Sequence, residues 1–393
     1  MAHDFIPFAL PSLGEEEIAA VTETLRSGWI TTGPTCARFE EAFARHQGTA
    51  HAVAVNSATA GLHLALEGIG VRPGDRVVTT PYTFTATAEV IRYLDADPLF
   101  VDVDPATYNI DPVATRRAIE EARGRGERVT ALIPVHIAGL ACDMAALAAL
   151  AEEYDIPLVS DAAHAFPARH GQRPLGAAGR ATVFSFYANK NITTGEGGMV
   201  TTDDGELAAR MRLMRLHGID RDAWRREENP KAHWYYEVVA PGFKYNLTDI
   251  AAAIGLAQLA KADAFRARRE MIVRRYDEAF ADLAPPVERP YDRLPHGRSD
   301  RFYADHAWHL YPLRVAEGRD RFIEELAARG IGSSVHFIPL HLQPYWRQRY
   351  GLTPDQFPHA TALYRAEVSL PLFPAMTDVM VERVAAAVRE LAR

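Results

Sequence analysis

Short apolar stretches alternate with helical patterns over the first two-thirds of the chain. Stretches rich in β-branched residues predict strands at residues 51–55, 76–80, 98–103, 128–135, 157–160, 181–186 and 199–202. Apolar residues that recur every three or four positions predict helices at residues 14–26, 58–68, 85–94, 112–123, 143–154 and 205–216. Strands that alternate with helices form crossover units. The pattern therefore predicts an α/β protein with a mostly parallel central sheet and helices on both faces.

The last third of the chain has a different pattern. A helical stretch begins after Thr248, a suitable N-cap, and continues to Phe280, ahead of two prolines. Beyond it, we expect strands at residues 309–315 and 333–337 and helices at residues 319–329 and 377–391. We place the domain hinge on the long helix, which gives a large domain over residues 1–260 and a smaller α+β domain over residues 261–393.

Charge and composition exclude several classes of function. The 393 residues carry 43 Lys plus Arg and 51 Asp plus Glu, a net charge of −8, with no basic stretch interleaved with aromatics, so nucleic acid is not expected as the main partner. No apolar stretch reaches the roughly 20 residues that span a bilayer, and no secretory signal is visible. Two cysteines form neither a disulfide framework nor a zinc site. We expect a cytoplasmic protein with no membrane partner and no metal.

An acid and a lysine follow two consecutive predicted strands. Asp161 comes directly after the strand at 157–160, and Lys190 follows the strand at 181–186. The carboxyl ends of parallel strands meet at one edge of the sheet, where ligands bind in such folds. Pyridoxal phosphate requires a lysine that forms a Schiff base and an acid beside its ring nitrogen. The pair therefore favours this cofactor.

Simpler interpretations of these residues exist. An acid at a strand end is more often a helix cap, and a lysine in a loop more often lies on the surface; only their joint spacing raises the functional interpretation to equal weight. Two nucleotide-binding motifs are excluded. The stretch at 195–200 has Val200 where the dinucleotide fingerprint needs its third glycine, and Lys190 is not part of a Gly-Lys-Ser/Thr element.

Several blocks resemble the DegT/StrS family of nucleotide-sugar aminotransferases. They are Ser-Asp-Ala-Ala-His-Ala at 160–165, Phe-Ser-Phe at 184–186, Lys-Asn-Ile-Thr-Thr-Gly-Glu-Gly-Gly at 190–198, Ser-Gly-Trp-Ile-Thr-Thr-Gly-Pro at 27–34 and Gly-Phe-Lys-Tyr-Asn-Leu-Thr-Asp-Ile at 242–250. The resemblance covers nearly the whole chain. It implies fold type I of the pyridoxal phosphate enzymes, the aspartate-aminotransferase-like fold. The version at 244–249 is closest to the branch that aminates C4 of UDP-linked 4-keto sugars.

The resemblance also implies roles for particular residues. Lys190 corresponds to the lysine that holds the cofactor and moves protons, and Asp161 to the partner of the pyridinium nitrogen. Other cofactor-binding residues implied in this way contact the ring or the phosphate: Ala58, Thr59, Phe84, His164 and Ser185. Ala58 and Thr59 belong to a turn that opens a helix, where free N–H groups and the helix dipole favour an anion.

Lys244 departs from the common family pattern. Many relatives have Asn there and Arg two residues later, whereas this chain has Lys244 and Asn246. In the family this loop crosses a dimer interface to the neighbouring subunit's cofactor phosphate, where a lysine can act as a point charge. The resemblance thus implies a homodimer with shared active sites.

The expected reaction cycles the cofactor between pyridoxal and pyridoxamine phosphate (PLP and PMP). L-glutamate is the expected amino donor and a nucleotide-linked keto sugar the acceptor. Residues that match where relatives contact substrate are Trp29, Thr31, His309, His336 and His341. Alternatives are a PMP-dependent dehydratase or other PLP chemistry on this scaffold, and, more remotely, a non-catalytic regulator. The dehydratases replace the lysine with histidine, so Lys190 favours transamination.

Overall fold

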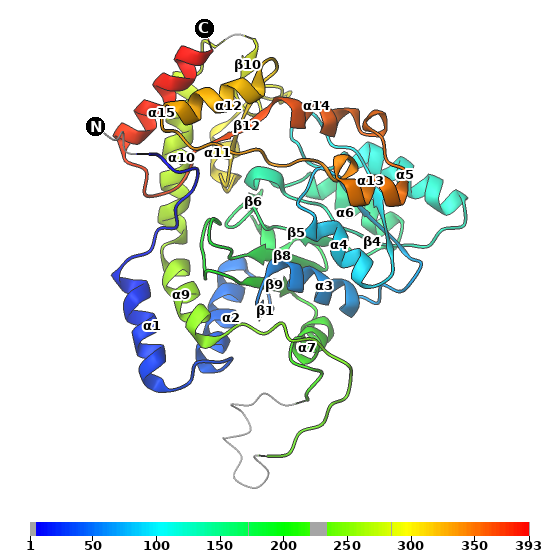
Figure 1. Ribbon diagram of the computed structural model, residues 1–393. Coiled ribbons are helices and arrows are strands. Elements are labelled where there is room, and N and C mark those ends of the chain that lie inside the picture. Colours follow the sequence, from blue (N-terminus) through cyan, green and yellow to red (C-terminus); the bar gives the residue numbers. More distant parts are fainter. Residues whose placement is uncertain (1–4, 172, 221–233, 284, 393) are drawn as a thin grey trace.

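A mostly parallel sheet forms the centre of the molecule (Figure 1). The computed structural model describes residues 5–171, 173–220, 234–283 and 285–392. The strands are β1 (His51–Val55), β2 (Arg76–Thr79), β3 (Asp97–Phe100), β4 (Val129–Leu132), β5 (Val159–Asp161), β8 (Ala181–Ser185) and β9 (Gly198–Thr202). The ladders β3-β2-β4 and β5-β8-β9-β1 are joined by parallel bridges that pair Leu132 with Leu158 and Val135 with Asp161. Only β9 runs antiparallel to its neighbours in this sheet, which confirms the predicted topology.

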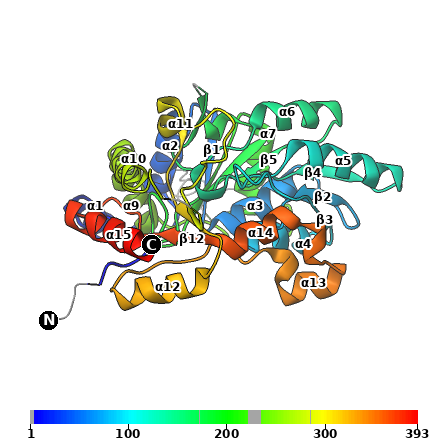
Figure 2. The same cartoon turned by 90° about the horizontal axis from the view of Figure 1, so that it is seen from above.

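Helices cover both faces of the sheet, because apolar side chains of each strand alternate between two cores. Val53 and Val55 pack with α3 (Ala58–Gly68), α4 (Ala86–Tyr93) and α7 (Gly205–Met214). Ala52 and Ala54 pack with α2 (Pro34–Gln47), α5 (Pro112–Gly124) and α6 (Met144–Glu153). Seen from above, α5 and α6 lie on one side of the sheet, and α3 and α4 lie on the other side (Figure 2). The α/β prediction is confirmed.

The long helix expected after Thr248 is divided in two. The Thr248 hydroxyl accepts a hydrogen bond from the N–H of Ala251 at 3.2 Å and caps α9 (Asp249–Ala260). The chain turns at Lys261 and continues as α10 (Ala262–Ala279). Figure 1 shows α1 (Glu15–Ser27) beside α9 and α10 leading to the C-terminal part.

The C-terminal part contains a small antiparallel sheet of β10 (Val287–Glu288), β11 (Tyr311–Val315) and β12 (Glu367–Leu370). Its helices are α11 (Asp300–Asp305), α12 (Arg319–Ala328), α13 (Pro344–Tyr350), α14 (Pro358–Ala366) and α15 (Asp378–Leu391). A short hairpin of β6 (Arg169–His170) and β7 (Arg173–Pro174) lies outside both sheets. Leu313 and Val368 share a core with Tyr276 of α10 and with Ile6, so the N-terminal segment packs on this part.

The prediction of a strand at residues 333–337 is wrong. Ser334 forms a single bridge with Ser369, and the chain then leaves the small sheet. The reason is a side chain: the N–H of His336 donates to the carboxyl of Glu367 at 2.7 Å instead of to a neighbouring strand.

Helix α2 was not among the predicted elements. The carboxylate of Asp249 caps its N-terminus and accepts from the N–H groups of Gly33, Thr35 and Cys36. Because the cap is supplied from a distant part of the chain, no local N-cap side chain marks where this helix begins.

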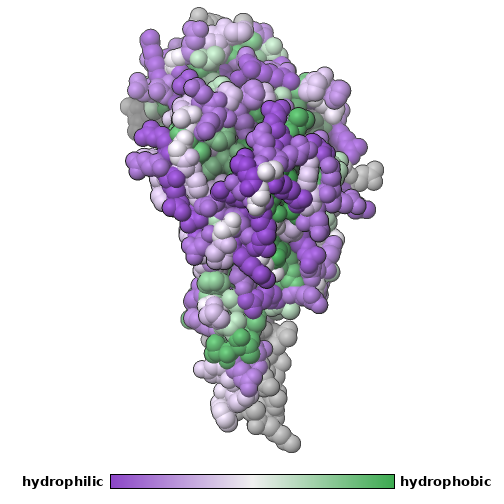
Figure 3. Space-filling view, turned by 90° about the vertical axis from the view of Figure 1, so that its right-hand side faces the viewer, coloured by the Kyte–Doolittle hydropathy of each residue, from purple (hydrophilic) through white to green (hydrophobic). Residues whose placement is uncertain are grey.

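The segment between α7 and α9 exposes apolar side chains. Val238 and Val239 are 62% and 56% exposed, and Trp234 is 72% exposed. One face of the molecule is mostly hydrophilic, with hydrophobic residues gathered toward its narrow lower end (Figure 3). Within the described residues, no helix is both long and apolar enough to cross a bilayer.

Candidate active site

A cavity of about 450 Å³ opens at the carboxyl edge of the large sheet. Strand ends, the start of α3 and loops from the C-terminal part meet around it. Of the residues predicted from the sequence, it is lined by Ala58, Thr59, Phe84, Asp161, His164, Ser185, Lys190, His309 and His336. The fold thus brings together residues that are more than 270 positions apart in the chain, as between Ala58 and His336.

The N-terminus of α3 forms one wall of this cavity. The Ser57 hydroxyl accepts the N–H of Ala60 at 3.1 Å, which leaves the N–H groups of Ala58 and Thr59 for a ligand. Gly198 allows β9 to pass close by, because a Cβ there would lie 2.7 Å from the nitrogen of Ala58. Ser185, the last residue of β8, adds a hydroxyl. Such a wall suits an anion.

Asp161 is the last residue of β5 and is 5% exposed. Its carboxyl accepts hydrogen bonds from the hydroxyl of Thr87 at 2.7 Å and from the N–H of Ala163 at 3.1 Å. Burial raises the pKa of Asp161, while these two donors and the nearby Lys190 act in the opposite direction. The donors fix the orientation of the carboxyl and leave it facing the cavity.

Lys190 lies in the loop after β8, where its N–H donates to the carbonyl of Tyr187 at 2.9 Å. Burial lowers the pKa of its amine to about 8, and the carboxyl of Asp161 opposes that change. A substantial fraction of the amine is therefore uncharged near neutral pH. An uncharged amine acts as a nucleophile or a base.

Three imidazoles line the cavity beside Lys190. The rings of His164 and His309 are 4.3 Å apart between centroids, and Nδ1 of His309 hydrogen-bonds Oδ1 of Asn191 at 3.1 Å. Burial and the charge of Lys190 lower the pKa of His336 to about 4, and burial lowers the pKa values of His164 and His309 well below the usual value for an imidazole. All three rings are neutral at pH 7 and supply hydrogen-bonding groups without charge.

Nδ1 of His164 is buried and has no hydrogen-bond partner in the part of the chain that the structure describes. Buried polar atoms are normally hydrogen-bonded, so an unsatisfied one at a cavity wall points to a bound ligand. Phe84 is 60% exposed at the rim, and its ring centroid is 6.0 Å from that of Phe337. An exposed ring in this position offers a flat apolar surface to a planar ligand.

Four predicted residues lie outside this cavity. Lys244 is exposed, and its carbonyl accepts from Nδ2 of Asn56 at 3.4 Å. The indole of Trp29 donates to the carbonyl of Thr32 at 3.1 Å, and Thr31 accepts the N–H of Asp249. His341 is buried and hydrogen-bonds the Thr361 hydroxyl at 2.8 Å.

Sequence reasoning missed three residues that shape the site. Thr87 holds Asp161, Asn191 holds His309 and also donates to two carbonyls, and Phe337 stacks with His164 at 5.5 Å. Thr87 carries a weak signal, since it is a polar side chain on the buried face of α4. Asn191 belongs to the block 190–198 that carries the family resemblance, but nothing local indicates that it contacts His309, and nothing local marks Phe337.

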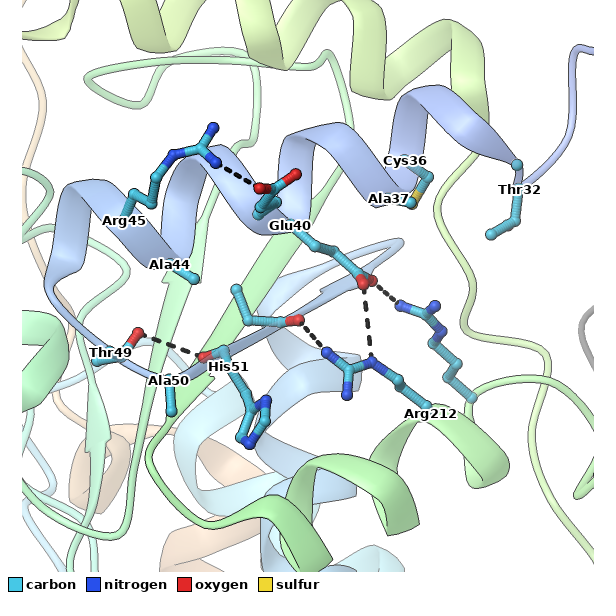
Figure 4. Close-up of a pocket in the computed structure, with 14 residues that line it drawn as sticks. Thr32, Cys36, Ala37, Glu40, Ala44, Arg45, Thr49, Ala50, His51 and Arg212 are labelled. Carbon is cyan, nitrogen blue, oxygen red and sulfur yellow. Dashed lines mark hydrogen bonds and ion pairs between the residues drawn. The ribbon is translucent and has the colours of Figure 1, made fainter.

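A second cavity of about 470 Å³ lies between α2, β1 and α7 (Figure 4). Its charged side chains pair with one another: Glu40 with Arg212 and Arg215, and Glu41 with Arg45. Because these charged side chains already form ion pairs with one another, they are not waiting for a charged ligand. The candidate site is therefore the cavity that contains Lys190.

Residues 11–389 match the family model described as the DegT/DnrJ/EryC1/StrS aminotransferase family. The chain belongs to this family. It is 46% identical over 392 residues to an uncharacterized protein, MJ1066, of Methanocaldococcus jannaschii (98% of this chain, 97% of the relative). It is 45% identical over 395 residues to the spore coat polysaccharide biosynthesis protein SpsC of Bacillus subtilis (99% and 97%).

Solved structures agree with the family assignment. The putative sugar aminotransferase Spr1654 of Streptococcus pneumoniae, in its PMP form, matches with a TM-score of 0.88 and 34% identity over 98% of this chain and 99% of that one. Helicobacter pylori PseC, an aminotransferase involved in the biosynthesis of pseudoaminic acid, matches with a TM-score of 0.87 and 30% identity over 99% of each chain. Fold type I is confirmed, and the chain is an aminotransferase that depends on pyridoxal phosphate, as predicted.

The cavity fits this cofactor on physical grounds. It combines a partly neutral lysine, a buried acid held by two donors, a helix N-terminus with free N–H groups and an unsatisfied imidazole nitrogen. Among the described residues, the side chains that bring a charge to its lining are Asp161, Lys190 and Glu196. Lys190 is thus the cation available to an anionic ligand within this lining.

Proposed function

We propose that this aminotransferase moves an amino group from L-glutamate to a nucleotide-linked keto sugar, specifically a UDP-linked 4-keto sugar, and forms an amino sugar. The observation that carries the proposal is the meeting of Lys190 and Asp161 in one cavity with three uncharged imidazoles. Spr1654 is described as a sugar aminotransferase, and SpsC as a polysaccharide biosynthesis protein, which supports a sugar acceptor. The resemblance of segment 244–249 to the branch that aminates UDP-linked 4-keto sugars supports this class of acceptor.

The proposed roles of the cofactor-binding residues follow from their chemistry. Lys190 holds the cofactor covalently and, when released, moves protons as an uncharged base. Asp161 pairs with the ring nitrogen, oriented by Thr87. When bound, pyridoxal phosphate supplies a ring that accepts electrons and stores the donated amino group. The remaining proposed contacts are the phosphate wall of Ala58, Thr59 and Ser185, and the ring neighbours Phe84 and His164.

The neutral histidines suit a sugar better than an acid. His309 and His336 offer ring nitrogens that donate to or accept from hydroxyl groups, without a charge that would need a counterion. A pocket with these groups discriminates by hydrogen bonding, which separates substrates that differ by one hydroxyl.

A groove of about 650 Å³ adjoins the cavity and shares Thr83, Phe84 and Phe337 with it. Tyr345, 55% exposed, and Ile338, 46% exposed, lie along it. A nucleotide sugar extends well beyond its sugar ring, and aromatic side chains stack on bases. We assign this groove to the nucleotide portion of the acceptor.

A second copy of the chain completes the proposed site. The lining supplies Lys190 as its cation, whereas the cofactor phosphate and the nucleotide both carry negative charge. Lys244 is exposed and follows the exposed Val238 and Val239 by six and five positions, and exposed apolar side chains of this kind suit association. We assign Lys244 to the cofactor phosphate of the partner subunit in a homodimer.

A substrate panel tests the function. UDP-, dTDP- and GDP-linked 4-keto and 3-keto sugars are incubated with the enzyme and glutamate, and 2-oxoglutarate release is measured alongside the mass of the sugar product. The proposal predicts the fastest release with a UDP-linked 4-keto sugar and a product that carries an amine. A dehydrated product, or release that does not depend on any sugar, contradicts it.

A further inference from the structure

Glu367 is a fully buried acid on β12, with 0% of its surface exposed. Two arginines lie near Glu367, but the contacts of each are with other groups, and the charge of Arg319 only partly opposes the effect of burial on the carboxyl. Arg319 donates at 3.2 Å to the main-chain carbonyl of Glu367, and Arg314 lies against the carboxylate of Glu288 at 3.7 Å. Acids in such surroundings are rare unless their oxygens are hydrogen-bonded.

The hydrogen bonds of Glu367 lead to the candidate active site. Its Oε2 accepts the main-chain N–H of His336 at 2.7 Å, and its Oε1 is hydrogen-bonded to the hydroxyl of Ser369. That hydroxyl also hydrogen-bonds Nδ1 of His336 at 2.9 Å. A continuous chain of hydrogen bonds therefore runs from the buried acid, through one hydroxyl, to an imidazole in the cavity wall.

Hydrogen bonds and a ring contact fix the main chain and the imidazole of His336. The hydroxyl of Tyr82 donates to its carbonyl at 2.8 Å, and the ring of Phe8 stacks on its imidazole at 5.3 Å. With the main-chain groups and Nδ1 all engaged, Nε2 is the polar atom left to face the cavity that His336 lines. Its neighbour Phe337 turns into the same cavity.

We propose that Glu367 is a positioning residue, which acts through Ser369 to hold the His336 ring and to determine whether Nε2 offers the sugar acceptor a proton or a lone pair. The inference rests on the proposed function in one respect, namely that a sugar occupies the cavity.

Whether Glu367 is protonated decides which group donates and which accepts in each of these hydrogen bonds. Burial raises the pKa of Glu367 to about 8, against the opposing effects of the Ser369 hydroxyl, the His336 N–H and the charge of Arg319. Below that pH the protonated acid donates to Ser369, Ser369 donates to Nδ1, and the proton of the neutral imidazole sits on Nε2. Above it the ionised acid accepts from Ser369, Ser369 accepts from Nδ1–H, and Nε2 becomes an acceptor.

The neighbouring groups do not change the order in which Glu367 and His336 lose their protons. The pKa of His336 is lowered to about 4, so its ring stays neutral while Glu367 titrates. The other titratable or charged groups that interact with these hydrogen-bonded residues come from the loops after β2, β3 and β10, from β11 and α12, and from the cavity wall: Tyr82, Tyr108, Tyr291, Arg314, Arg319, His164, His309 and Lys190.

The first test reads the proton position without any substrate. Holoenzyme labelled with ¹⁵N-histidine is examined by NMR at pH 6.5 and pH 9, and the His336 signals are identified by their loss in His336→Gln. We expect the proton on Nε2 at pH 6.5 and on Nδ1 at pH 9. In Glu367→Gln it stays on Nε2 at both, because the amide donates permanently to Ser369. The proposal is overturned if the proton of wild-type His336 stays on the same nitrogen at both pH values. It is also overturned if, at pH 9, neither Ser369→Ala nor Glu367→Gln changes the position of that proton.

The second test separates the two halves of the reaction. Ser369→Ala should raise KM for the keto sugar about tenfold and leave the half-reaction with the amino donor within about twofold of wild type, the size expected for one lost hydrogen bond. Glu367→Gln should keep wild-type KM for the keto sugar at pH 7, and its KM should depart from the wild-type value above pH 8; the titration of Lys190 in the same range affects both proteins alike, so the ratio of the two KM values isolates Glu367. Equal losses in both half-reactions overturn the proposal.

Ser334→Ala is the matched control. Ser334 lies opposite Ser369 but bonds it only through the main chain, at 2.8 and 3.1 Å, so this variant should match wild type in both tests. If no sugar is accepted at all while the NMR result holds, the proposed substrate is wrong and the positioning role stands. If sugars are aminated but the proton position never responds, the positioning role is wrong and the proposed function stands.

Discussion

The hydroxyl of Thr87 donates to Oδ2 of Asp161 at 2.7 Å, although 74 residues separate the two in the chain. Thr87 is fully buried on α4 and also hydrogen-bonds the hydroxyl of Thr83 at 2.7 Å. The pair Thr83–Thr87 is therefore a relay of hydroxyls that ends on the acid. It holds the carboxyl in one orientation before any cofactor arrives, which is how preorganised sites avoid reorganisation during the reaction.

Thr87→Val preserves shape and removes this donor. A hydrogen bond to a charged group is worth about 1.5–3 kcal/mol, so turnover should fall roughly 10- to 100-fold. Thr83→Val, which touches Asp161 only through Thr87, should lower it less. Steady-state kinetics of both variants check the order. A larger loss in Thr83→Val than in Thr87→Val contradicts the relay.

The pKa of Lys190 predicts how the apoenzyme takes up its cofactor. Only the uncharged amine attacks the aldehyde, and burial lowers the pKa of this amine from 10.5 to about 8. The rate of cofactor uptake should therefore rise about tenfold per pH unit below pH 8 and level off above it. Stopped-flow absorbance of apoenzyme mixed with pyridoxal phosphate measures this rate. A rate that still rises through pH 10 indicates an ordinary exposed lysine.

Mixed dimers test whether Lys244 acts across the interface. Subunits with Lys190→Ala and with Lys244→Ala are expressed with different tags and purified as a heterodimer. If Lys244 serves the partner's site, one of the two sites carries neither change, and about half of wild-type activity is expected. The two variant homodimers serve as controls, and both should be nearly inactive. An inactive heterodimer places Lys244 at the site of its own subunit.

Tyr345→Ala tests the nucleotide groove. Tyr345 is exposed and lies outside the cavity of Lys190, so its loss should raise KM for the nucleotide sugar without changing the donor half-reaction. Stacking on one base is worth about 1–3 kcal/mol, which corresponds to roughly a 5- to 150-fold rise in KM. Val379→Ala, which changes a 73% exposed residue on α15, serves as the control. An unchanged KM in Tyr345→Ala places the nucleotide elsewhere.

The sequence predicted most of the large sheet because its signals are local. β1 and α3 appear at their expected bounds, and the shift from β-branched runs to helical spacing fixes them without knowledge of the fold. The sequence also predicted that Asp161 and Lys190 lie at the same edge of the sheet, because the carboxyl ends of parallel strands meet at one edge, and both residues line the cavity there.

The features that sequence reasoning missed depend on contacts between distant residues. Asp249 caps α2, Glu367 takes the N–H of His336 out of the expected strand, and Asn191 positions His309. Each contact is polar and joins residues far apart in the sequence, so no periodicity marks it. The domain boundary at residue 260 and the cytoplasmic location stay predictions.

The covalent attachment of the cofactor tests the central claim most directly. The chain has four lysines, at positions 190, 231, 244 and 261. Holoenzyme is reduced with borohydride, which fixes the cofactor to whichever amine holds it, then digested and mapped by mass spectrometry. The account predicts the added mass on Lys190 alone, and none in Lys190→Ala, which should fold but not turn over. Added mass on another lysine, or undiminished turnover in Lys190→Ala, contradicts it.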